Sequence, residues 1–249
     1  LTDESLWSGN KYNIDRLADK LCNKDRANHI VDALHKYLAD EYTCRALCFC
    51  VNKKHADFMA EQLCLYGFNA QSLTSDTPTE QRKEFANQLR EGSIHYLCVV
   101  DIFNEGVDIP EVDTVLFLRP TDSLTIFLQQ LGRGLRLSVG KIELTVLDFV
   151  AQANRKYDFA SRFRALTLNP EKNIKRQIEE GFTFLPHGCS IVMEKKARQY
   201  ILDNIQSAIY NKTRIVREIN SYVNSVPTIS QFLEGNGQDI RILYQGTNC

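Results

Sequence analysis

The spacing of apolar residues changes character twice along the chain. Residues 11–41 carry apolar side chains at helical spacing, among them Ile30 and Leu34, and this period predicts helix. Residues 45–51 are almost wholly apolar instead, which is typical of a strand buried on both faces of a parallel sheet. Beyond Pro170 the chain becomes polar and helical again. We therefore predict three regions: a helical linker or N-terminal extension at 1–44, an α/β domain at 45–168 and a helical accessory region at 169–249.

Helices and strands alternate through the middle region. Asn52 can cap a helix, and Gly67 is well placed to end it. Thr77 to Glu80 have the pattern of a capping box with proline at the first helical position, and the helix that follows should stop at Gly92. Strands are predicted at 45–51, 69–74, 94–100, 114–118 and 144–150, and further helices at 123–131, 154–166, 171–180, 193–224 and 227–234.

This alternation predicts the fold class. Strands and helices at such spacing form an open parallel sheet with right-handed crossovers and flanking helices. Such a sheet binds its ligand at the carboxyl ends of its strands. The predicted fold is therefore an α/β parallel sheet with a helical C-terminal extension. Its functional loops should follow Val51, Leu73, Val100 and Leu118.

Composition narrows the class of protein only slightly. The chain has 249 residues, of which 43% are apolar and 24% charged, values that are ordinary for a globular protein. The net charge of -1 gives no global sign of nucleic-acid binding, although a local basic groove is compatible with it. The sequence contains no apolar run long enough for a transmembrane helix. The polar start without methionine is unlike a signal peptide and predicts an excised fragment.

The cysteines predict a reducing compartment. The sequence has eight cysteines and contains no CxxC pair. Five of them fall within predicted strands or helices among apolar neighbours: Cys44, Cys48, Cys50, Cys64 and Cys98. We interpret them as reduced core residues of a cytosolic protein, in preference to a disulfide or zinc framework.

The first distinctive loop follows the predicted 94–100 strand and has the sequence DIFNEGVDIP at 101–110. Gly106 lets the backbone approach a phosphate closely, and the carboxylate of Asp108 can accept hydrogen bonds from a ribose. A turn made of Gly, Asp and Pro is also ordinary loop chemistry. Alone, this loop leaves both interpretations open.

The second distinctive stretch is QQLGRGLR at 129–136. Arg133 and Arg136 are three residues apart and can face the same way if the backbone is helical. Guanidinium groups make fork-shaped contacts with phosphate oxygens and keep their charge. At the ligand edge of the sheet, where we expect them, they fit stabilisation of a transferring phosphoryl group. A solvated basic helix end is the alternative, and the glycines on either side of Arg133 disfavour it.

These stretches resemble the second RecA-like domain of superfamily 2 helicases and translocases. Residues 45–63 resemble motif IV, 98–112 motif V and 129–136 motif VI, which has the pattern Q-x-x-G-R-x-x-R. The E-G-x-D-x-P-E-V form at 105–112 is similar to the excision-repair and type I or III restriction branches, which favours DNA as the track. Residues 45–168 are accordingly expected to be a RecA-like helicase C-terminal domain.

The resemblance implies roles for matching positions. Arg136 matches the arginine finger that reaches the γ-phosphate, and Arg133 matches its phosphate-contacting partner. Four further residues are implied to contact or sense the nucleotide: Gln129, Glu105, Gly106 and Asp108. Asn52, Lys53, Thr74 and Ser75 fall where the family grips the nucleic-acid backbone, although polar residues at strand ends are also common in loops.

One position departs from the family pattern. Many relatives carry threonine before the aspartate of motif V, and its hydroxyl contacts a nucleic-acid phosphate. Val100 stands there in this sequence, so the contact is lost or has moved to Asn104.

Two phosphate-handling motifs do not occur in the sequence. It contains no G-x-x-x-x-G-K-[ST] loop to cradle phosphates and no D-E-x-[HD] pair to hold Mg²⁺. The family places both on a first RecA-like domain in the same polypeptide. The resemblance therefore implies that ATP with Mg²⁺ is bound mainly by that domain. ATP binding and hydrolysis would close and open the cleft between the halves.

Two other functions compete with a motor half. One is a stand-alone nucleic-acid- or protein-binding module with a helicase-like fold and no ATP turnover, against which the intact 129–136 pattern argues. The other is a nucleotide-binding enzyme of another doubly wound family, which lacks support because G-x-G-x-x-G is missing. The 169–249 region can bind DNA, dock another domain or cover the sheet. Its basic residues at 195–198 and 212–217 fit a solvated helix face.

Overall fold

The computed structural model describes residues 4–8, 11–100, 109–120, 124–149, 159–167, 174–182, 185, 187, 189–209 and 228. By its contacts the chain forms two compact units, Asp3–Ala151 and Gln152–Cys249. The region boundaries predicted at 44 and 168 remain predictions, because compactness does not test how function is divided. The helix predicted at 227–234, and most of the predicted helical segment beyond residue 209, lie outside the described residues.

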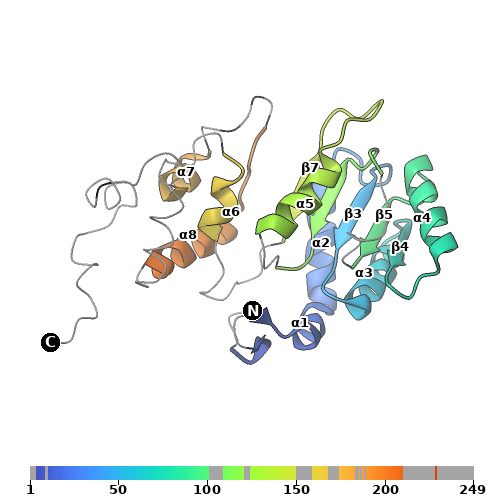
Figure 1. Ribbon diagram of the computed structural model, residues 1–249, viewed down its shortest axis with the longest axis horizontal. Coiled ribbons are helices and arrows are strands. Elements are labelled where there is room, and N and C mark those ends of the chain that lie inside the picture. The colour runs from blue at the N-terminus through green and yellow to red at the C-terminus, as the bar shows by residue number, and fades with distance from the viewer. Residues whose placement is uncertain are drawn as a thin grey trace. The chain divides into compact units, whose positions relative to one another are not determined.

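A parallel sheet of five strands forms the first unit, in the order β4-β5-β3-β6-β7 (Figure 1). The strands are β3 (Ala46–Phe49), β4 (Ala70–Leu73), β5 (Tyr96–Val99), β6 (Thr114–Phe117) and β7 (Thr145–Asp148). Every neighbouring pair is parallel. The predicted α/β fold class is thereby confirmed, and each strand lies within its predicted range.

The central strands explain why the sequence shows apolar runs and no alternation. All residues of β3, β5 and β6 are buried, because helices cover both faces of the sheet. The edge strands differ: Gln71 in β4 is exposed, and β7 is only partly buried. Helix α3 (Lys53–Leu65) and residues 30–34 share one core cluster with β3 and β5.

The helix caps confirm some predictions and correct another. The side chain of Asn52 accepts the N–H of His55 and caps α3, as predicted. Helix α4 (Thr79–Glu91) ends at Gly92, whose φ of 82° is a left-handed cap. The predicted capping box is wrong. Pro78 is the cap residue and gives no side-chain bond, because the hydroxyl of Thr77 accepts the N–H of Thr74 instead.

The N-terminal region is divided into shorter elements than predicted. Residues 11–41 contain a two-residue strand and two helices, α1 (Ile14–Leu21) and α2 (Lys24–Tyr37), where helix alone was predicted. The side chain of Asn23 accepts the N–H of Arg26 and starts α2 afresh. A short 3-10 turn and a two-stranded hairpin precede α1: η1 (Glu4–Leu6), β1 (Trp7–Ser8) and β2 (Lys11–Tyr12). Both helices contact α3.

The described cysteines are free thiols. Cys44, Cys48, Cys50 and Cys98 are buried as predicted, whereas Cys64 is exposed on α3, so its assignment to the core is wrong. Burial raises the pKa of Cys44 to about 11 and also raises the pKa of Cys48 and Cys50. These residues therefore pack as small apolar side chains.

The second unit is helical in its described part. It contains α6 (Phe159–Arg164), α7 (Ile174–Glu180) and α8 (Lys195–Ile209), which contact one another. Aromatic packing joins them, with the ring centroids of Phe163 and Phe182 5.4 Å apart. Lys195 and Lys196 are exposed at the start of α8, and the predicted basic cluster at 212–217 lies outside the described residues.

Candidate functional site

The predicted phosphate-binding residues gather at one end of α5 (Leu124–Gly134), and we call Gln129, Arg133 and Arg136 the arginine end. Gln129 is exposed and Arg133 lies half-buried in the last turn. The helix ends at Gly134, so Arg136 has already left it and is exposed. The two arginines thus come from a helix turn and from the chain just beyond it.

The arginine end does not lie where the sequence predicted. Gly134 packs against Leu144, which directly precedes β7, and against Val115 near the start of β6. These are the amino ends of the strands, opposite the edge predicted to hold the ligand. The prediction is wrong because α5 carries the chain back across the sheet before the arginines occur (Figure 1).

Close packing at Gly134 fixes the end of α5. A Cβ atom there would lie 2.5 and 2.8 Å from the two methyl groups of Leu144 and 3.2 Å from Val115. Such separations are shorter than van der Waals contact, so only glycine lets the helix approach this closely. A Cβ at Gly132 meets nothing within 4 Å. The two glycines around Arg133 therefore have different roles.

Lys141 ties the arginine end to a second segment. Its ammonium donates to the carbonyl oxygens of Gly134 at 2.5 Å, Arg136 at 3.0 Å and Pro110 at 3.3 Å. A cation suits these positions because the last carbonyls of a helix carry partial negative charge. Burial lowers the pKa of Lys141, with Asp113 and Glu111 acting in the opposite direction.

Large apolar side chains lie exposed directly after the arginine end. Leu137 is 96% exposed, Val139 104% and Ile142 99%. Gln130, by contrast, is fully buried, and neither atom of its amide has a hydrogen-bond partner among the described residues. Sequence reasoning missed Gln130, since the motif pattern assigns that position no residue type.

The motif V loop lies outside the described residues. This applies to Asn104, Glu105, Gly106 and Asp108, whose assignments remain predictions. Val100, at the position where relatives carry threonine, packs against the main core cluster.

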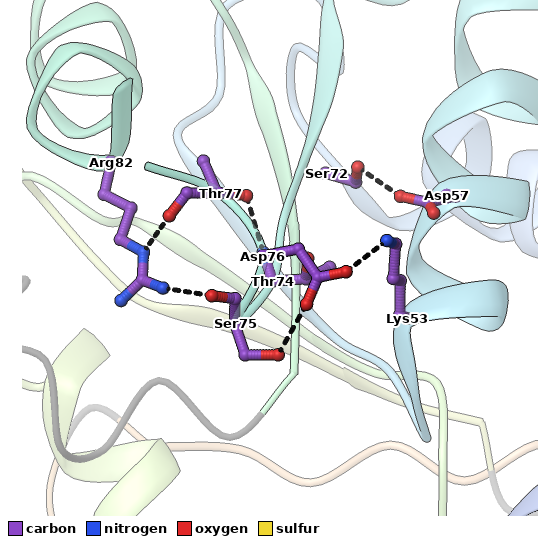
Figure 2. Close-up of polar contacts among 8 residues, drawn as sticks. All are labelled: Lys53, Asp57, Ser72, Thr74, Ser75, Asp76, Thr77 and Arg82. Carbon is purple, nitrogen blue, oxygen red and sulfur yellow. Dashed lines mark hydrogen bonds and ion pairs between the residues drawn. The ribbon is translucent and has the colours of Figure 1, made fainter. Parts of the chain in front are cut away.

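The predicted backbone-gripping residues meet at the carboxyl edge of the sheet, and we call Asn52, Lys53 and the turn 74–77 the lysine edge (Figure 2). Asn52 and Lys53 begin α3 after β3, and the turn follows β4. The amide of Asn52 is engaged at both ends, because its nitrogen also donates to Asp15 at 3.3 Å. The structure thus brings all four predicted residues to one edge.

An aspartate that sequence reasoning missed lies among them. Lys53 Nζ is 2.5 Å from Oδ2 of Asp76, and the hydroxyl of Ser75 donates to Oδ1 of the same carboxylate at 3.3 Å (Figure 2). Lys53 lowers the pKa of Asp76, and Asp76 raises the pKa of Lys53. Nearby, the hydroxyl of Ser72 donates to Asp57 at 2.5 Å.

Arg82 of α4 stabilises the turn 74–77 by hydrogen bonds to its backbone. Its guanidinium donates to the carbonyl oxygens of Thr77 and Ser75, each at 2.6 Å (Figure 2). Thr77 and Thr74 also bond to each other through two hydrogen bonds. Charge-assisted bonds to backbone carbonyls are among the stronger hydrogen bonds in proteins. The turn is therefore held in one conformation by its own chain.

A buried histidine underlies the lysine edge and was also missed. His55 is fully buried, and its Nδ1 accepts the N–H of Val51 at 3.2 Å. Arg26 donates to the carbonyl oxygens of Leu118 at 3.2 Å and Phe149 at 3.5 Å, beyond the ends of β6 and β7. Burial, together with the charges of the nearby arginines, lowers the pKa of His55 to about 3. The ring is therefore neutral.

The described residues contain neither a metal-binding cluster nor a membrane-spanning helix. No group of three or more His, Cys, Asp or Glu side chains there is arranged to hold a metal ion. None of the helices seen in this part of the chain has the length and apolar character needed to cross a membrane.

Comparison with known proteins identifies the class. Residues 29–138 match the family model described as the helicase conserved C-terminal domain. The chain is 30% identical over 135 residues to the IRC3 helicase of Saccharomyces cerevisiae, covering 54% of this chain and 20% of that protein. It is 33% identical over 141 residues to UvrABC system protein B of Kosmotoga olearia, covering 53% of this chain and 21% of that protein.

A solved structure supports the same fold. The crystal structure of the yeast DEAD-box splicing factor Prp28 aligns with a TM-score of 0.52 at 17% identity, covering 72% of this chain and 34% of that one. Residues 29–138 therefore resemble the conserved C-terminal domain of helicases. These similarities agree with the resemblance of motifs IV to VI to superfamily 2 helicases. The chain spans about a fifth of the length of these two curated relatives.

Proposed function

We propose that this chain is the C-terminal motor half of an ATP-dependent nucleic-acid helicase or translocase. The observation that carries the proposal is the arginine end, where Arg133 and Arg136 are positioned by the close packing of Gly134. Arg136 acts as the arginine finger on the γ-phosphate, and Arg133 contacts phosphate beside it. Fork-shaped, permanently charged groups suit the charge that develops during phosphoryl transfer.

ATP and Mg²⁺ are shared with a first RecA-like domain. The donor set of this chain fits part of that ligand, since guanidiniums match phosphate oxygens. The sequence lacks a P-loop, and no carboxylate cluster among the described residues is arranged to hold the metal. Gln129 and the 105–108 segment contact the nucleotide from this side. The exposed Leu137, Val139 and Ile142 support a partner surface, because contiguous exposed apolar side chains are typical of interfaces.

The lysine edge is the proposed nucleic-acid contact. Lys53 is an exposed cation that pairs with Asp76 of the turn that carries Thr74 and Ser75, and ammonium and hydroxyl groups bind backbone phosphates without regard to sequence. The similarity of residues 105–112 to the repair and restriction branches favours DNA over RNA as the track. Comparison of binding to DNA and RNA strands of one sequence distinguishes the two.

ATP turnover tests the proposal. We expect the 249-residue chain alone to hydrolyse no ATP and to bind it weakly. Joined to a first RecA-like domain, it should show ATP hydrolysis that nucleic acid stimulates. Phosphate release measured with and without a 30-nucleotide strand provides the assay. Robust turnover by the chain alone, or turnover that is indifferent to nucleic acid, overturns the proposal.

A further inference from the structure

The carboxylate of Asp76 occupies two of the four residues assigned to the nucleic-acid backbone. Its Oδ2 lies 2.5 Å from the ammonium of Lys53, and its Oδ1 accepts the hydroxyl of Ser75 at 3.3 Å (Figure 2). A phosphate group offers the same chemistry, two adjacent anionic oxygens that accept from an ammonium and a hydroxyl. Asp76 thus makes the contacts that a backbone phosphate would make.

The surrounding contacts make this arrangement more than a casual surface ion pair. Arg82 holds the carbonyls of Ser75 and Thr77, and the hydroxyl of Thr77 accepts the N–H of Thr74. The turn that carries Asp76 is therefore fixed, while the side chains of Lys53 and Asp76 remain 56% and 63% exposed. A ligand can reach the pair from solvent without disturbing the fold.

We propose that Asp76 is an internal competitor for nucleic-acid phosphate, which holds Lys53 and Ser75 in the free protein and exchanges with the phosphate when a strand binds. This inference rests on the proposed nucleic-acid role of the lysine edge. The competitor lowers affinity at this point, and it also gives Lys53 a partner each time the protein releases a phosphate. A motor that steps along a strand has to break such contacts repeatedly.

The next residue of α3 provides a matched control. Lys54 Nζ is 2.6 Å from Oδ1 of Asp19, with side chains 65% and 63% exposed. This pair resembles Lys53–Asp76 in distance and exposure, but its aspartate comes from α1 and no predicted phosphate contact involves it. Asp76→Asn and Asp19→Asn change the net charge equally, so a difference between them is not a general charge effect.

The experiment measures binding of a fluorescein-labelled 20-nucleotide DNA strand to the 249-residue chain by anisotropy, across a series of salt concentrations. Asp76→Asn should tighten binding about three- to fivefold at low salt, the range that one exposed ion pair can supply. The slope of log affinity against log salt should change little, because Lys53 contacts a phosphate in both proteins and no phosphate contact is added. Asp19→Asn should tighten binding much less.

Two further variants separate the possible failures. Lys53→Gln should weaken binding, and in that background Asp76→Asn should lose most of its gain, because the exchange acts through Lys53. If Lys53→Gln leaves affinity unchanged, the proposed nucleic-acid role of this edge is wrong. If Lys53→Gln weakens binding but Asp76→Asn behaves like Asp19→Asn, the lysine edge keeps its proposed nucleic-acid role. The competitor role of Asp76 is then disproved. Far-ultraviolet circular dichroism and thermal melting check that each variant is folded.

Discussion

The arginine end and the lysine edge lie at opposite edges of the same sheet and are held by different means. The arginine end is positioned by close packing of Gly134 against the side chains of Leu144 and Val115. The lysine edge is held by side-chain hydrogen bonds and an exposed ion pair. The first arrangement leaves no room for another side chain, whereas in the second a ligand can replace one partner.

This difference suits the two tasks proposed for them. A group that stabilises a transition state has to stand in a fixed place, because small displacements lower the rate steeply. Contacts to a moving strand have to form and break within each cycle. The predictions below challenge this division, beginning with the largest expected effect.

Arg136→Ala should lower ATP turnover about a thousandfold or more in the protein that carries this chain, because loss of a finger arginine removes charge stabilisation in the transition state. Steady-state phosphate release measures the effect, and an unchanged melting temperature shows that the fold is intact. Lys195→Ala, an exposed cation in the second unit, is the control. A kcat that Arg136→Ala leaves unaltered removes the assigned role.

Gly134→Ala should destabilise the chain by about 1 to 3 kcal/mol, the usual cost of overpacking, because Leu144 has to move away from the added methyl group. Gly132→Ala should instead stabilise it by about 0.5 to 1 kcal/mol, since alanine favours helix and the position is open. Urea unfolding of both variants measures the difference. Equal effects would show that α5 is not fixed by close packing.

Acid should destabilise the chain through His55, which underlies the lysine edge. The pKa of His55 is about 3 in the folded chain and about 6.5 when unfolded. The unfolded state therefore takes up the proton first, and stability falls as the pH drops below 6.5. One such group lowers the free energy of unfolding by about 2 kcal/mol between pH 6.5 and 5.

Urea unfolding at those two pH values tests this expectation. The His55→Gln variant should be less stable at neutral pH but should lose much less on acidification. A wild-type chain whose stability is constant from pH 6.5 to 5 contradicts a buried, neutral His55.

Lys53→Gln should weaken strand binding by about fivefold, the smallest of these effects, because an exposed cation contributes modestly to phosphate binding. Lys54→Gln, from the neighbouring ion pair, should change affinity less. Salt titration of the binding constant measures both. Equal losses would mean that the edge attracts nucleic acid by general charge alone.

The sheet was predictable from sequence because its central strands are buried on both faces. Apolar runs such as 46–49 and 96–99 have few alternatives, and glycine ends the helices at Gly67 and Gly92 for steric reasons. The capping box at Thr77 failed because two local hydrogen bonds compete for one hydroxyl, and the sequence does not say which wins. The break at Asn23 was missed for a similar reason, since apolar spacing continues across it.

The candidate site was predicted in part. The motif pattern of residues 129–136 singled out Arg133 and Arg136, because it requires arginine at a fixed spacing, and their roles stay predictions. The edge occupied by the arginines was not predictable from order along the chain alone, since it depends on where α5 ends. Asp76 was missed because its partner Lys53 is distant in sequence, and His55 was missed because its role arises mainly from burial.

The three hydrogen bonds of Lys141 connect two segments that the chain keeps far apart in sequence. An ammonium has three hydrogens, and here they reach Pro110 on one side and Gly134 and Arg136 on the other. Pro110 lies two residues after Asp108, the predicted ribose contact. Any shift of one segment against the other has to break at least one of these bonds. Lys141 therefore couples Pro110 mechanically to Gly134 and Arg136, and we expect the proposed nucleotide loop and the proposed arginine finger to move together.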